Sequence, residues 1–226
     1  NTGGFRFMLK EEFLINGLSV FQDDDLYTFT SDSILLSKFA AVKGKDSVAD
    51  FCAGCGIVGF NLYALNRDKI KSVTFFELQK PLFDLCEKNI AHNSLAETFS
   101  AVNCDLKTFP KEYYGKFSVI VCNPPYMKKG VDSFSAPEIG ACKSETFLPL
   151  SSLAFSIGKG LKFGGKVFLI HRAERLAELI YELKTNGVEP KRLQFISAGE
   201  KPPYAFLLEG VKGGKAGITV LNTLQN

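Results

Sequence analysis

The 226-residue sequence has no apolar run as long as the ~20 residues that a membrane-spanning helix needs. It also has no N-terminal segment that is first basic and then apolar, as in secretion signals. Residues 1–7 precede Met8 and are set aside as a foreign or trimmed arm. These absences predict a cytoplasmic protein with reduced thiols. The net charge is only +3, which permits an anionic partner without requiring one.

The sequence is also poor in motifs that bind metal. Six cysteines are present, but only Cys52 and Cys55 form a CxxC pair. A zinc site of this type needs a second pair, so we expect no metal. A redox role for Cys52 and Cys55 stays an alternative, although the glycines around them are more typical of a ligand-binding turn.

Strands and helices alternate from residue 47 onward, which predicts a parallel sheet with helices on both faces. We expect seven strands, at 47–51, 73–77, 99–103, 117–122, 166–171, 192–196 and 204–210. The expected helices cover 31–42, 57–66, 82–93, 150–161 and 173–186. The short connection 197–203 predicts that the last strand is antiparallel. Residues 1–30 are expected to form a tail and a hairpin-like extension (13–30) before the main domain, 31–226.

A glycine-rich turn follows the first strand of this sheet. Gly54, Gly56 and Gly59 have the spacing of a nucleotide-binding loop that leads into a helix. Asp50 precedes them, and a carboxylate there would repel a pyrophosphate. It suits a cofactor that carries a cationic or amino group, such as S-adenosylmethionine, better than NAD. A plain tight turn is the alternative.

Polar residues also end the next three strands. Glu77 could accept both hydroxyls of a ribose, Asp105 could accept an adenine amino group, and Asn123 ends the fourth strand. Each acid alone would be read as a solvated turn residue or a helix cap. Their recurrence at successive strand ends predicts one cofactor site.

The stretch after Asn123 reads Asn-Pro-Pro-Tyr. An exocyclic amino group is a poor nucleophile because its lone pair is delocalised. The Asn123 side-chain oxygen and the Pro124 carbonyl could accept its two N–H bonds, and Pro125 would keep the backbone rigid. Tyr126 offers a ring on which a planar target can stack. A simple strand-ending turn is the competing interpretation.

At this point the chain, from about residue 11, resembles the bacterial tRNA(Val) adenine N6-methyltransferase family. The matching stretches are TSDSILLSKFA (30–40), DFCAGCGIVG (50–59), FELQ (76–79), VIVCNPPYMKKG (119–130), HRAERLAEL (171–179), GVEPKRLQFI (187–196) and LEGVKGGKAGITVL (208–221). The resemblance implies a Rossmann-like class I methyltransferase fold and methylation of the adenine 3′ to the anticodon of one valine tRNA.

The resemblance also implies the residues of the site. The catalytic residues would be Asn123, Pro124, Pro125 and Tyr126. S-adenosylmethionine would be bound by Thr30, Asp32, Asp50, Ala53, Gly54, Gly56, Glu77, Leu78, Asp105, Leu106 and Asn123.

Two departures from the family pattern stand out. Cys52 replaces the first motif glycine, and its side chain could crowd the cofactor. The string Lys143-Ser144-Glu145 lacks the histidine that is frequent in the family, which leaves the substrate open.

The expected partner is tRNA, bound by a monomer. Lys128, Lys129 and Lys143 are the candidate phosphate contacts, since they lie in or next to the long segment after the motif. His171 is a weaker candidate for a base. A glutamine N5-methyltransferase that acts on a release factor stays an alternative, and so does a binding protein of this fold without activity.

Overall fold

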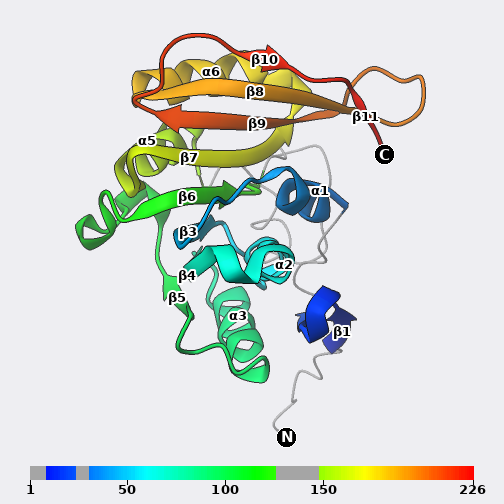
Figure 1. The fold of residues 1–226 in the computed structure, drawn as a ribbon, viewed down its shortest axis with the longest axis vertical. Coiled ribbons are helices and arrows are strands. Elements are labelled where there is room, and N and C mark those ends of the chain that lie inside the picture. The colour runs from blue at the N-terminus through cyan, green and yellow to red at the C-terminus, as the bar shows by residue number, and fades with distance from the viewer. Residues whose placement is uncertain (1–8, 24–30, 126–147) are drawn as a thin grey trace, which may run out of the picture.

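The computed structural model describes residues 9–23, 31–125 and 148–226, and its centre is a twisted sheet (Figure 1). The strand order is β10-β8-β9-β7-β6-β3-β4-β5, and β11 pairs with β8. The strands are β3 (Asp46–Phe51), β4 (Ile70–Glu77), β5 (Phe99–Asn103), β6 (Phe117–Cys122), β7 (Leu161–Arg172), β8 (Val188–Ser197), β9 (Ala205–Lys212), β10 (Thr219–Val220) and β11 (Leu224–Gln225).

The seven strands that the sequence predicts are β3 to β9. β5, β4, β3, β6 and β7 run parallel, whereas β9 is antiparallel to both β7 and β8. The predicted antiparallel last strand is therefore confirmed. β10 and β11 extend the edge beyond these seven. They escaped prediction because strands of two residues are too short to carry a periodic signal.

Within residues 31–125 and 148–226, five α-helices pack on the two faces of the sheet. They are α1 (Ser31–Phe39), α2 (Ile57–Asn66), α3 (Lys80–His92), α5 (Leu150–Gly160) and α6 (Leu176–Thr185). Short 3₁₀ turns are η1 (Ile15–Gly17), η2 (Arg67–Lys69), η3 (Leu106–Thr108), η4 (Lys111–Tyr113) and η5 (Ala173–Arg175). The helix predicted at 173–186 begins with η5 and continues as α6.

The core is divided by the sheet into two clusters. Successive residues of a strand point to opposite faces, so Val48 joins the cluster under α1, α2 and α3, while Ala49 joins the one under α5 and α6. Phe60 of α2 and Leu153 of α5 are fully buried on these two sides. Both faces of the sheet are therefore covered, and its strand ends are left for binding.

A separate hairpin precedes the sheet. β1 (Leu9–Phe13) and β2 (Ser19–Asp23) pair antiparallel, and the turn between them contains Asn16 and Gly17, both with positive φ. The Asn-Gly turn that the sequence indicated is present, although the hairpin begins earlier than residue 13. The division of the chain at residue 30 stays a prediction, because residues 24–30 lie outside the described residues. The predicted cofactor residue Thr30 is one of them.

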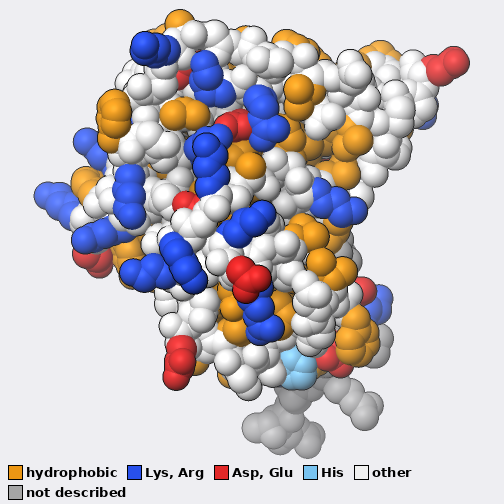
Figure 2. All heavy atoms as spheres, viewed as in Figure 1, with side chains coloured by type: hydrophobic (Ala, Val, Ile, Leu, Met, Phe, Trp, Pro, Cys, Tyr) orange, Lys and Arg blue, Asp and Glu red, His pale blue; other side chains and the backbone are white. Residues whose placement is uncertain are grey.

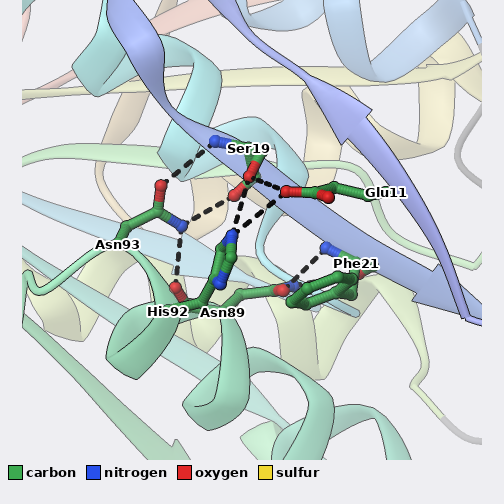
Figure 3. A network of polar contacts seen from close by, with 6 residues as sticks. All are labelled: Glu11, Ser19, Phe21, Asn89, His92 and Asn93. Carbon is green, nitrogen blue, oxygen red and sulfur yellow. Dashed lines mark hydrogen bonds and ion pairs between the residues drawn. The ribbon is translucent and has the colours of Figure 1, made fainter.

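Polar contacts join the hairpin to α3 (Figure 3). The Ser19 hydroxyl donates to Oε1 of Glu11 at 2.6 Å, and Nε2 of His92 lies 3.0 Å from that hydroxyl. Asn93 bonds the backbone N–H and carbonyl of Ser19, and Asn89 does the same for Phe21. The turn of the hairpin is also tied to α2, since Nδ2 of Asn16 donates to the Ala64 carbonyl at 2.6 Å. Among the described residues, no helix is both long and apolar enough to cross a membrane.

Candidate active site

The four predicted polar residues do lie along one edge of the sheet. Asp50, Glu77 and Asn123 are at or just after the ends of β3, β4 and β6, and Asp105 follows β5. These four strands are neighbours and parallel, in the order β5-β4-β3-β6, so their carboxyl ends share one edge. Open α/β sheets bind their ligands at this edge.

Asp50 is a buried carboxylate with one oxygen free. Its Oδ2 accepts the backbone N–H of Gly59 at 2.8 Å, and its Oδ1 is buried without a hydrogen-bond partner in the described part of the chain. Burial raises the pKa of Asp50 well above its ordinary value, and the nearby charge of Glu77 adds to this effect. Such an oxygen is suited to a cationic or hydrogen-donating ligand group.

Both carboxylate oxygens of Glu77 accept a backbone hydrogen bond, whereas only one oxygen of Asp50 does. Its Oε2 accepts the N–H of Gly54 at 2.8 Å, and its Oε1 accepts that of Gln79 at 2.9 Å. Burial raises its pKa. Two backbone donors fix the plane of the carboxylate, and each oxygen keeps a further lone pair for a ligand hydroxyl.

The glycine loop brings α2 close to the sheet. Gly54 and Gly56 have positive φ, which glycine adopts without strain. A Cβ on Gly59 would lie 2.5 Å from a ring carbon of Phe75, so only glycine lets α2 pack on β4 at this distance. Ala53 is buried, and its N–H donates to the carbonyl of Phe76 at 3.1 Å.

Cys52 also has a left-handed backbone, with φ of 58°. Residues with a Cβ adopt this conformation at a cost of roughly 1–2 kcal/mol. The neighbouring Cys122 thiol and burial hold the pKa of Cys52 well above its usual range. The side chain packs against the core beneath α5, and its expected crowding of the cofactor stays a prediction.

Asp105, the predicted contact of the adenine amino group, already has partners for both carboxylate oxygens. Oδ1 of Asp105 accepts the N–H of Lys107 at 2.9 Å, and its Oδ2 lies 3.2 Å from Nζ of the same lysine. An adenine amino group would have to share these oxygens. Leu78 is 42% exposed and Leu106 is buried, so Leu78 offers the more accessible apolar surface at this edge.

Asn123 is the polar residue at the end of β6. Its Nδ2 donates to the Ser33 hydroxyl oxygen of α1 at 3.1 Å. Its Oδ1 is buried and has no hydrogen-bond partner among the described residues. Pro124 and Pro125 follow Asn123 in the chain, the first buried and the second half-buried.

Sequence reasoning singled out Asp32 in α1 but missed Ser33. Asp32 is buried, and the Tyr204 hydroxyl lies 3.5 Å from its Oδ1. Ser33 carried no signal of its own, because a serine in the first helical turn is common. The predicted residues Tyr126, Lys128, Lys129 and Lys143 lie outside the described residues.

His171 ends close to this edge but is poorly suited to act as a base. Its Nδ1 accepts the backbone N–H of Arg172 at 2.9 Å, and its ring stacks on Phe206. Burial lowers the pKa of His171 to about 4. The imidazole is therefore neutral near pH 7 and a weak proton acceptor.

Comparison with known proteins identifies the family of this chain. Residues 14–142 match the family model described as methyltransferase small domain. The chain belongs to this family. A tRNA1(Val) (adenine(37)-N6)-methyltransferase of Shewanella sediminis is 26% identical over 183 residues, 79% of this chain and 73% of the relative. The corresponding protein of Photobacterium profundum is also 26% identical, over 79% of this chain and 75% of its own length.

The fold of this methyltransferase also matches solved structures. TYW2 of M. jannaschii, in complex with AdoMet, aligns with a TM-score of 0.64 at 13% identity, over 91% of this chain and 86% of that one. At this identity the likeness concerns the fold alone. It confirms the predicted Rossmann-like class I architecture.

The residues of the methyltransferase fit S-adenosylmethionine, which the family assignment supports as the cofactor. The free Oδ1 of Asp50 and the fixed carboxylate of Glu77 flank a loop with two left-handed glycines. Carboxylates at this edge favour a ligand with a positive charge and hydroxyl donors, and they disfavour a pyrophosphate. In the described part of the chain, no group of three His, Cys, Asp or Glu residues could hold a metal ion.

Proposed function

We propose that this methyltransferase transfers a methyl group from S-adenosylmethionine to the exocyclic N6 of an adenine in tRNA, the anticodon-loop adenine of a valine tRNA. The observation that carries the proposal is the Asn123 amide, whose buried Oδ1 has no hydrogen-bond partner in the described part of the chain. It lies at the same edge as Asp50 and Glu77 and is followed by two prolines. A buried, unpaired acceptor on a rigid segment is suited to receive an N–H from a bound amine.

The proposed cofactor residues would contact different parts of S-adenosylmethionine. Asp50 would attract the positively charged methionyl part, and Glu77 would accept the ribose hydroxyls. We propose the remaining contacts, as the resemblance implies, for Thr30, Asp32, Ala53, Gly54, Gly56, Leu78, Asp105, Leu106 and Asn123. The bound cofactor supplies an electrophilic methyl on sulfonium, so the protein's task is to place an amine in line with it.

At the target, the chain's own groups would orient the amine and its ring. Oδ1 of Asn123 and the Pro124 carbonyl would accept the two N–H bonds, which favours a geometry with the lone pair directed toward the methyl group. Tyr126 would stack on the base, and Pro125 would restrict the backbone. The adenine must leave its stack in the RNA to reach this position.

Two observations favour tRNA as the substrate. The relatives that match most of the chain are named as tRNA1(Val) (adenine(37)-N6)-methyltransferases. Lys and Arg side chains are also spread over the face seen in Figure 2, with fewer acidic side chains between them. Such a face attracts the phosphates of RNA without reading its sequence. Lys128, Lys129 and Lys143 would add contacts near the target, and we propose that the protein acts as a monomer in the cytoplasm.

The direct test is methyl transfer to unmodified valine tRNA by the purified protein, with the modified nucleoside identified by mass spectrometry. We expect N6-methyladenosine from the wild type, and a rate at least about 100-fold lower for Asn123→Ala, because an oriented acceptor at a reacting group contributes about that much. Undiminished transfer by Asn123→Ala would remove the proposed role of the motif. A release factor methylated in preference to tRNA would instead favour a glutamine N5-methyltransferase.

A further inference from the structure

Ser33 contacts Asn123 although 90 residues separate them along the chain. The Ser33 side chain is buried in the first turn of α1, and its hydroxyl oxygen accepts Nδ2 of Asn123 at 3.1 Å. The Oδ1 of the same amide has no hydrogen-bond partner among the described residues. The two ends of the Asn123 amide are therefore in different surroundings.

This difference matters because the two ends of an amide have nearly the same shape. A rotation of 180° exchanges the oxygen and the nitrogen, and a serine hydroxyl can accept from the nitrogen or donate to the oxygen, whereas the N–H bonds of a target amine need the oxygen. With nitrogen and oxygen exchanged, the amide would present a donor to the target amine and repel it. We propose that Ser33 is a positioning residue whose hydrogen bond restrains rotation of the Asn123 amide and so keeps its other end ready to accept an N–H of the target amine; this inference rests on the proposed function.

The helix that carries Ser33 is itself fixed at several points. Nδ2 of Asn61 in α2 donates to the Ser37 hydroxyl at 2.5 Å, one turn after Ser33. At the start of α1, Nδ2 of Asn226 donates to the Ser31 hydroxyl at 2.9 Å. Leu36 is fully buried in the core between these contacts. Because α1 is anchored on both sides of Ser33, its hydroxyl meets the amide in a preorganised position.

The chain offers a matched control for the test. Ser33 and Ser37 are both 1% exposed and lie on the same helix, and each bonds an asparagine amide. Only Ser33 bonds Asn123. We expect Ser33→Ala to lower kcat about tenfold, the equivalent of one hydrogen bond, with an unchanged KM for S-adenosylmethionine. Ser37→Ala should lower the melting temperature by a similar amount as Ser33→Ala but change kcat less than about twofold.

Each outcome points to a different conclusion. If the wild type methylates tRNA and Ser33→Ala is as active as Ser37→Ala, the positioning role is overturned while the proposed function stands. If the wild type methylates no tRNA, the proposed function itself fails.

Discussion

The backbone N–H of Gly59 donates a hydrogen bond to Oδ2 of Asp50 at 2.8 Å, across the loop that joins β3 to α2. The other oxygen of Asp50 is buried and has no hydrogen-bond partner among the described residues. The bond from Gly59 depends on the close packing of α2 on β4, which only glycine at position 59 allows. The position of α2 and the hydrogen bonding of the Asp50 carboxylate are therefore coupled.

Gly59→Ala should disturb both the core and the site. The new Cβ would lie 2.5 Å from the Phe75 ring and 3.1 Å from Oδ2 of Asp50, so α2 has to shift. We expect a loss of about 1–3 kcal/mol in the free energy of unfolding, measured by urea denaturation, as for other overpacked cores. Calorimetry should show weaker S-adenosylmethionine binding.

Gly44→Ala is the control for this variant. Gly44 is exposed, and a Cβ there meets nothing within 4 Å. We expect its stability and cofactor affinity to stay near those of the wild type. Equal effects of the two alanines would show that packing at position 59 does not support the site.

Asp50→Asn tests how much the buried charge of Asp50 lowers the stability of the folded protein. Its pKa is higher in the folded protein than the ordinary 3.8, so the folded state binds the proton more tightly. The stability of the wild type should therefore fall as pH rises from about 3.8 through the raised pKa of Asp50. Asparagine keeps an acceptor for Gly59 and carries no charge.

We therefore expect Asp50→Asn to gain stability relative to the wild type at neutral pH, and the difference to shrink as pH falls toward 4. Cofactor binding should be lost or reduced at least about tenfold, since a charged partner is removed. Urea denaturation across pH and calorimetry at pH 7 measure the two effects. A difference in stability that does not vary with pH would contradict the raised pKa.

Cys52 can be tested by comparing Cys52→Gly with Cys52→Ala. Both remove the thiol that contacts Cys122, but only glycine relieves the φ of 58°. We expect the glycine variant to be more stable than the alanine variant by about 1 kcal/mol. If the Cys52 side chain crowds the cofactor, Cys52→Gly should also bind S-adenosylmethionine more tightly than the wild type. Equal affinity of the glycine variant and the wild type would show that it does not.

Much of the fold was predictable from local patterns. The apolar runs and the helical periods after residue 47 predicted the seven strands from β3 to β9 and four helices of the sheet. The short 197–203 connection predicted the antiparallel β9, which the pairing of β7 with β9 confirms. The strands β10 and β11 could not be predicted, because they exist only where an extended segment lies beside β8.

The candidate site divides in the same way. The sequence by itself determined that Asp50, Glu77, Asp105 and Asn123 share one edge, since parallel neighbouring strands present their carboxyl ends together. It also determined the glycine turn, because that backbone conformation is encoded locally.

Only the tertiary structure decided which atoms of these residues are free. The occupied oxygens of Asp105, the unpaired Oδ1 of Asp50 and the contact of Asn123 with Ser33 follow from the packing of helices on the sheet. Hydrogen bonds between residues 90 positions apart depend on where the chain places them in space, and no local pattern records that distance.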